Sequence, residues 1–148
     1  MKTQLIKLIA KATLLGAMMI LPLGASAQAQ SLADRPRFNI PFDFAFGGKQ
    51  LPAGEYSFVR ALATSGDIML SLTDRNGRSK VIVLSHATMR LRPTSKAALI
   101  FHRYGDQYFL AQVWPAGAET GREFSKSKSE REIQAQQNLS EVRIPSDR

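Results

Sequence analysis

Two histidines and a few carboxylates are the side chains of this sequence that could support acid–base chemistry or bind a metal ion. His86 and His102 are the only histidines, and there is no cysteine. Disulfides, zinc–thiolate sites and thiol nucleophiles are therefore excluded. Metal sites use several converging ligands, so two isolated histidines do not predict one. His102 lies beside Arg103 in an expected strand, which favours a structural role, and His86 is expected in a loop.

Paired carboxylates on facing strands could hydrolyse a glycosidic bond. Asp43 and Glu55 are the early candidates, one on the polar face of a strand and the other after a turn. We expect both on the surface, because acids are mostly exposed. No Gly-x-Ser-x-Gly elbow is present, and Gly47-Gly48 lacks the context of a phosphate loop. The sequence therefore predicts no catalytic residue, no metal ligand and no cofactor. A small secreted hydrolase with an unrecognised carboxylate or His site is the alternative.

The basic residues gather in the middle of the chain, whose formal net charge is +8. Ile68 to Gly105 contains seven basic residues and one acid. Three of the cations, Arg90, Arg92 and Lys96, lie in a long connection expected between Ser85 and Ala97. Recognition usually sits on such loops, and cations there suit phosphate or carboxylate groups. We expect an anion or partner contact at these three residues, and no nucleic acid, because no aromatic residue separates them.

A second contact surface is expected at three aromatic residues of the next hairpin, Tyr104, Tyr108 and Trp114. If these rings are exposed together, they favour a binding module over an enzyme. Because the sequence contains no metal-ligand set, activated nucleophile or phosphate loop and its middle is basic, the expected function is that of a non-catalytic, envelope-associated or binding module. Its partner would be an envelope component or another protein.

The N-terminus has the pattern of a secretory signal peptide, residues 1–27. Three lysines precede an apolar run of about 12 residues, shorter than the about 20 that a spanning helix needs. Ala25-Ser26-Ala27 fits the cleavage rule, with a second candidate after Ala29. The pattern predicts export to the periplasm or the cell exterior, with no transmembrane segment in the mature chain. Removing the leader takes three charges and leaves +5. The expected organisation is a leader (1–27), a flexible lead-in (28–36), a single β domain with a C-terminal helix (37–137) and a tail (138–148).

Arg37 to Phe46 predicts the opening strand. Every second residue in it is large and apolar, so in an extended chain these residues point to one face. Pro41 predicts an edge strand or a bulge, because it lacks the N–H that a ladder needs. The apolar row consists of Phe38, Ile40, Phe42, Phe44 and Phe46.

Two dipeptides predict two-residue hairpin turns, Asn76-Gly77 and Gly105-Asp106. A turn of known length fixes the register of its hairpin. Ser127 and Glu130 have the spacing of a capping box and predict a helix from Ser127 to about Gln137. The expected pairs include Leu72 with Val81, Thr73 with Lys80, Phe101 with Leu110 and Ile100 with Ala111. Together these elements predict an all-β fold, a small antiparallel barrel or sandwich of about six strands with one C-terminal helix.

Several segments resemble a group of short secreted proteins of Gram-negative soil bacteria. The resemblance covers nearly the whole chain after the leader. It implies secretion and a compact β fold, and it carries over no activity and no functional residue. The segments that carry it are Ile40–Phe44, Leu51–Tyr56, Phe101–Leu110, Trp114, Gly121–Glu123 and Ser127–Glu132.

Overall fold

The computed structural model describes residues 35–63 and 67–147. The leader and nearly all of the lead-in predicted from the sequence lie outside these residues. The described residues belong to one compact unit. The strands are β1 (Arg37–Ile40), β2 (Phe44–Phe46), β3 (Lys49–Leu51), β4 (Gly54–Ala63), β5 (Ile68–Asp74), β6 (Ser79–Met89), β7 (Ala98–Tyr104), β8 (Gln107–Trp114), β9 (Thr120–Phe124) and β10 (Ser140–Pro145), with helix α2 (Lys128–Gln134) between β9 and β10.

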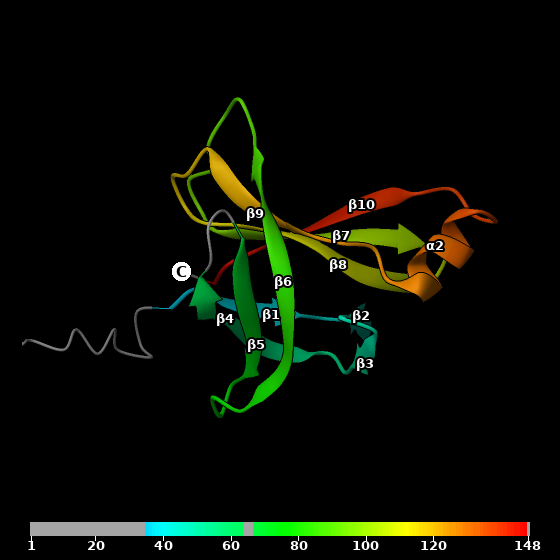
Figure 1. Cartoon of the computed structure of the whole chain (residues 1–148), viewed down its shortest axis with the longest axis horizontal. Helices are drawn as coiled ribbons and strands as arrows, with labels where there is room; N and C mark the ends of the chain where they lie inside the picture. Colours follow the sequence, from blue (N-terminus) through cyan, green and yellow to red (C-terminus); the bar gives the residue numbers. More distant parts are fainter. Residues whose placement is uncertain (1–34, 64–66, 148) are drawn as a thin grey trace, which may run out of the picture. The chain divides into compact units, whose positions relative to one another are not determined.

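All the described strands join one sheet, so the all-β expectation is confirmed (Figure 1). The order is β1-β4-β5-β6-β9-β8-β2-β3, and β8 also pairs with β7, which pairs with β10. Every pair is antiparallel except β2 with β8. The sheet is open, because β1, β3 and β10 each have a single neighbour in the described chain, so a closed barrel is wrong. The expected six strands are also too few, since the described residues contain ten.

The opening apolar row points into the core, as predicted, but it is divided between two strands. Phe38 and Ile40 of β1 and Phe44 and Phe46 of β2 are buried, and Phe42 between them is half-buried. The chain leaves the ladder after Ile40, where Pro41 offers no N–H. Strand β1 is an edge strand, as the proline predicted. Full burial of each large apolar side chain contributes about 1.5–3 kcal/mol.

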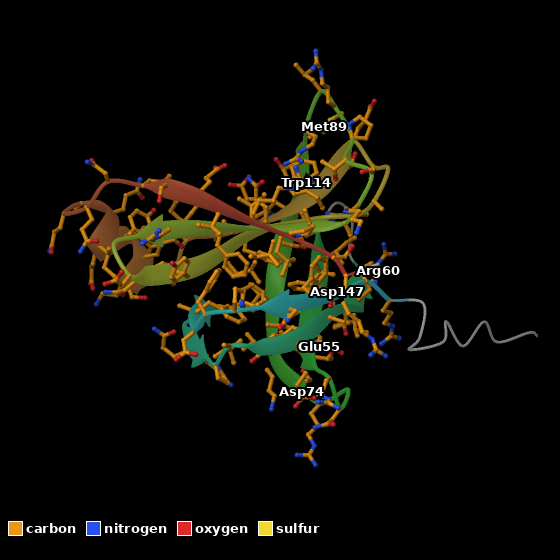
Figure 2. The ribbon with its side chains drawn as sticks, turned by 180° about the vertical axis from the view of Figure 1, so that it is seen from behind. Glu55, Arg60, Asp74, Met89, Trp114 and Asp147 are labelled. Atoms are coloured by element: carbon orange, nitrogen blue, oxygen red, sulfur yellow. The ribbon has the colours of Figure 1, made fainter. Side chains whose placement is uncertain are left out.

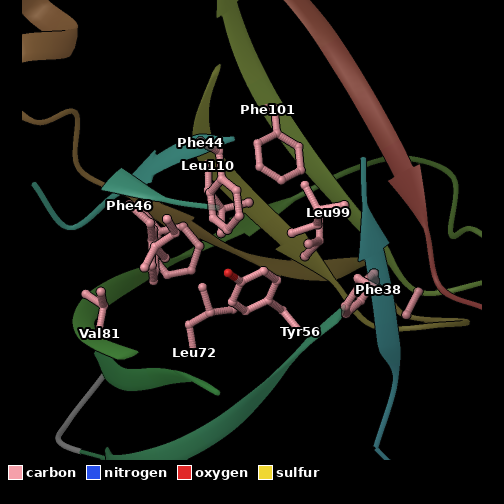
Figure 3. Packing of buried hydrophobic residues seen from close by; sticks show 13 residues of the cluster. Phe38, Phe44, Phe46, Tyr56, Leu72, Val81, Leu99, Phe101 and Leu110 are labelled. Carbon is pink, nitrogen blue, oxygen red and sulfur yellow. The ribbon is translucent and has the colours of Figure 1, made fainter. Parts of the chain in front are cut away.

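Aromatic rings from distant strands meet in this core (Figure 3). Phe44 of β2 packs edge-on against Phe101 of β7, with ring centroids 5.5 Å apart. Phe46 packs in the same way against Phe124 of β9 at 4.7 Å. Edge-to-face pairs of this kind contribute about 0.5–1.5 kcal/mol beyond their buried area. The rings therefore hold β2 against β7 and β9, two strands that are distant from it in the sequence.

The hairpin of β5 and β6 has its predicted pairs except next to the turn. Leu72 faces Val81 as expected, whereas Thr73 faces Ser79 and not Lys80. The register shifts between Leu72 and Thr73 because one strand carries an extra residue there.

The turn of this hairpin explains the shift, and the predicted two-residue turn is wrong. The N–H of Asp74 donates to the carbonyl of Arg78, which leaves three residues in the loop. Gly77 has a φ of 74°, and no described non-glycine residue has a positive φ. A type I turn followed by a glycine in the left-handed region has this pattern. The Asp74 carboxylate favours it by accepting the N–H groups of Asn76 and Arg78.

The hairpin of β7 and β8 has the predicted two-residue turn. Gly105 has a φ of 58° and Asp106 does not have a positive φ, the pattern of a type II′ turn. The predicted pairs nearest the turn are present. Farther along, Ile100 faces Gln112 and not Ala111, because the ladder is interrupted beside Ile100.

The C-terminal region contains more structure than the sequence indicated. Helix α2 begins at the predicted cap, Ser127, whose hydroxyl accepts the N–H of Glu130, and it ends at Gln134. Strand β10 lies in the expected tail and pairs with β7, so the β domain extends beyond its predicted end. Beyond β10, the N–H of Asp147 donates to the carbonyl of Arg37 at 3.0 Å.

Candidate functional site

The loop between β6 and β7, residues 90–97, is shorter and better anchored than expected. Strand β6 continues to the residue before it, so His86 lies in a strand and not in a loop. The N–H of Arg90 donates to the carbonyl of Glu119 at 2.9 Å. The N–H of Gly117 donates to the carbonyl of Thr94 at 2.7 Å. These bonds fix the β6–β7 loop against the loop that joins β8 and β9.

The end of β6 and the start of this loop carry apolar side chains into solvent. Leu91 is 99% exposed and Met89 is 75% exposed. Arg92 is exposed beside them. Figure 2 shows Met89 near the outer end of this projecting segment. We call Met89 to Arg92 the loop tip. Hydropathy alone predicts burial of both apolar residues, so the sequence did not single them out.

Arg90 connects the loop tip to the body of the protein. Its guanidinium carbon lies 3.8 Å from the centroid of the Trp114 ring, a cation–π contact. The ring is fixed in turn: its Nε1 donates to Gln112 Oε1 at 2.9 Å. A Cβ added to Gly121 would approach the ring within 2.6 Å, so only glycine fits beneath it. Arg90 is therefore held in place, whereas Arg92 points into solvent.

The end of the loop lies beside a second cation. Lys96 and Arg143 line an open depression of about 430 Å³ together with Thr94, Ser95 and Pro145. Arg143 comes from β10, which explains why sequence reasoning missed it. The alternation of Val142 and Ile144 was the signal available, since both are half-buried and Arg143 between them is exposed. The structure thus places Arg90 and Arg92 at the tip and pairs Lys96 with a cation from another strand.

The expected aromatic surface is not formed. Tyr104 is 0% exposed and Trp114 is 2% exposed. Tyr108 is half-buried and stacks on Phe42 with ring centroids 3.8 Å apart. Burial, and next the negative charge of Glu130, raise the pKa of Tyr104. The prediction of three exposed rings is wrong for two of them, because these strands are covered on both faces.

His102 forms a buried pair with Glu130. The distance from His102 Nδ1 to Glu130 Oε1 is 2.6 Å, and both side chains are almost fully buried. The Tyr104 hydroxyl lies 3.5 Å from the same oxygen. The cavity beside Glu130 measures about 20 Å³, room for about one water molecule and none for a substrate. This pair ties α2 to β7, which agrees with the structural role expected for His102.

The other titratable candidates are on the surface and apart from one another. His86 Nδ1 lies 2.9 Å from Asp67 Oδ1, and both are substantially exposed. Asp43 accepts the N–H of Ala53 at 2.8 Å. Glu55 pairs with Arg37 at 3.2 Å. Across residues 35–63 and 67–147, no three His, Cys, Asp or Glu side chains are grouped to hold a metal ion.

No helix in the described part of the chain has the length and hydropathy needed to cross a membrane. Comparisons with protein-family models, curated proteins and solved structures find no match to this chain.

Proposed function

We propose that this chain is a non-catalytic binding protein that is exported and attaches, through the β6–β7 loop, to a phosphate-bearing lipid surface of the cell envelope. The observation that carries the proposal is the full exposure of Leu91 between Arg90 and Arg92 on an anchored loop. The leader predicted at residues 1–27 and the resemblance to secreted proteins support export to the periplasm or the cell exterior.

The composition of the loop tip suits the boundary between lipid headgroups and acyl chains. Burying a leucine side chain away from water is worth about 1.5–3 kcal/mol. A cation near an anionic lipid surface adds about 1 kcal/mol. Arginine also forms paired hydrogen bonds with phosphate oxygens. Leu91 and Met89 would enter the boundary while Arg92 binds a headgroup phosphate.

The depression at the other end of the loop offers a second anion contact. Lys96 and Arg143 supply two cations, and the hydroxyls of Thr94 and Ser95 supply hydrogen-bond donors. A second contact would raise affinity without any new apolar burial, because linked contacts act together.

The test is sedimentation of the protein, expressed with its own N-terminus and collected after export, with vesicles of phosphatidylglycerol and phosphatidylcholine or of phosphatidylcholine alone. We expect binding to the anionic vesicles only. Binding should weaken between about 0.01 M and about 0.15 M salt, where the Debye length falls from about 30 Å to about 8 Å. Arg92→Ala should reduce partitioning about fivefold, and Leu91→Ser about tenfold.

The chain offers a matched control for each change. Arg75 and Arg78 are exposed at the β5–β6 turn, which carries no exposed large apolar residue, so Arg75→Ala with Arg78→Ala should change partitioning less than Arg92→Ala alone. Leu139 is exposed far from the loop in the sequence, and Leu139→Ser should have no effect. The proposal fails if the parent does not sediment with anionic vesicles, or if the Leu91→Ser and Arg92→Ala variants bind them as strongly as the parent does.

A further inference from the structure

A cavity of about 390 Å³ lies where β4 and β5 face β8 and β9 without pairing to them. Its walls come from five strands. Phe38, Phe58 and Leu70 line one part of the cavity, and Val113 and Trp114 line another. This volume is within the range of about 300–1,000 Å³ typical of small-molecule sites. The cavity is therefore large enough for a ligand, and its walls are mainly apolar.

Two arginines interrupt this apolar lining. Arg60 and Arg122 are the charged residues among the described residues that line the cavity, and no acid is among them. Arg60 faces Leu70 across the β4–β5 ladder and therefore follows Phe58 on the core-facing side of β4. In the described part of the chain, its guanidinium has no ion-pair or hydrogen-bond partner. The Arg60 guanidinium is therefore available to pair with an anion that enters the cavity.

We propose that this cavity binds a small amphiphile with an apolar hydrocarbon body and a carboxylate head group. The body occupies the space between Phe58, Leu70 and Val113, and the carboxylate pairs with Arg60. The planar guanidinium suits a carboxylate because it donates two parallel hydrogen bonds. The proposal does not depend on the membrane contact, because none of the cavity residues touches the lipid in that proposal. Trp114 links the two regions, since it lines the cavity and contacts Arg90 of the loop.

The single tryptophan of the chain reports on this site. Trp114 lines the cavity and is almost fully buried, so an occupant that touches it should change its fluorescence. The experiment titrates the full chain with three probes of the same alkyl length. Dodecanoate and dodecyltrimethylammonium are kept below their micelle-forming concentrations, and dodecanol is kept below its solubility limit. We expect saturable binding, with dodecanoate about tenfold tighter than dodecanol and the cationic probe weakest.

Two variants separate the head-group contact from the apolar contact. Arg60→Gln should weaken dodecanoate about tenfold and leave dodecanol unchanged, because only the charged pair is lost. Arg60 is exposed, so this variant is expected to fold. Val113→Phe fills the cavity and should abolish binding of both probes. Val59→Phe, on the opposite face of β4, should bind as the parent does.

The outcomes are distinct from those of the vesicle experiment. Leu91→Ser should lose vesicle binding and keep the dodecanoate affinity. The inference is overturned if dodecanoate does not change the tryptophan fluorescence of the parent. This result is expected if a segment of the chain itself fills the cavity. The inference is also overturned if Arg60→Gln binds dodecanoate with the parent's affinity, or if Val113→Phe, folded by circular dichroism, still binds.

Discussion

The guanidinium of Arg90 rests on the ring of Trp114, with its carbon 3.8 Å from the ring centroid. The same ring lines the apolar cavity. One tryptophan therefore contacts both the loop that we assign to the lipid surface and the cavity that we assign to an amphiphile.

Arg90→Met tests the energetic value of this contact. Methionine preserves most of the aliphatic stem and removes the charge, so the cation–π contribution of about 0.5–2 kcal/mol should be lost. Urea unfolding followed by fluorescence measures the difference. Arg92→Met is the control, since Arg92 is exposed on the same loop without a ring beneath it, and it should unfold at the parent's urea concentration.

Two glycine substitutions should destabilise the protein for different reasons. Gly121→Ala places a Cβ 2.6 Å from the Trp114 ring, and overpacking of this kind costs about 1–3 kcal/mol. Gly77→Ala meets no atom within 4 Å, but its φ of 74° costs about 1–2 kcal/mol for a residue with a side chain. Thermal melting should show both losses, and only Gly121→Ala should shift the tryptophan emission. An unshifted spectrum for Gly121→Ala would contradict the packing described.

Glu130→Ala leaves His102 without the carboxylate that lies 2.6 Å away. A buried polar group that loses its partner costs about 1–3 kcal/mol. Adding His102→Phe to this variant should cost less than the two changes measured separately, because they remove one interaction. Glu132→Ala is the control, since its pair with Lys128 is exposed, and it should change stability little. Additive losses in the double variant would argue against the pair.

Asp74→Asn should change how stability depends on pH. A hydrogen bond from Lys80, and next the backbone N–H of Arg78, hold the pKa of Asp74 below its ordinary value of 3.8. A lowered pKa stabilises the fold above pH 3.8, and this stabilisation is lost as pH falls through the lower folded value. The parent should therefore exceed the variant in stability at neutral pH, and the difference should vanish in acid. Asp106→Asn alters only a 3.9 Å contact with Arg103, so the stability of this variant should depend on pH as that of the parent does.

The sequence predicted the apolar strands of the core better than the short strands with few buried residues. The alternating row from Phe38 to Phe46 and the glycine of each hairpin turn are local signals, so they identified the buried face and most partners in the hairpins. Strands β9 and β10 are short and contain few buried residues. Whether such segments become strands depends on distant partners, here β6, β8 and β7, which local patterns do not reveal.

In the candidate sites, too, the sequence predicted the features that depend on local position and missed those that depend on distant contacts. The exposure of Arg92 and Lys96 followed from their loop position. The exposure of Leu91 did not, because an apolar residue is usually predicted inside. The cavity was invisible in the sequence, since it depends on how β4 and β5 are held against β8 and β9. The presence of Arg60 on an apolar face was the one local sign of it.

The pairing of β10 with β7 bears on how the chain folds as it is made. Strand β10, which completes the pairing of β7, emerges during synthesis after all the other described strands. Until then β7 presents an unpaired edge, and such edges recruit strands from other molecules. Folds with many such distant pairings are also slow to form. A chain that has not yet made β10 therefore exposes an edge of β7 that is paired in the described fold.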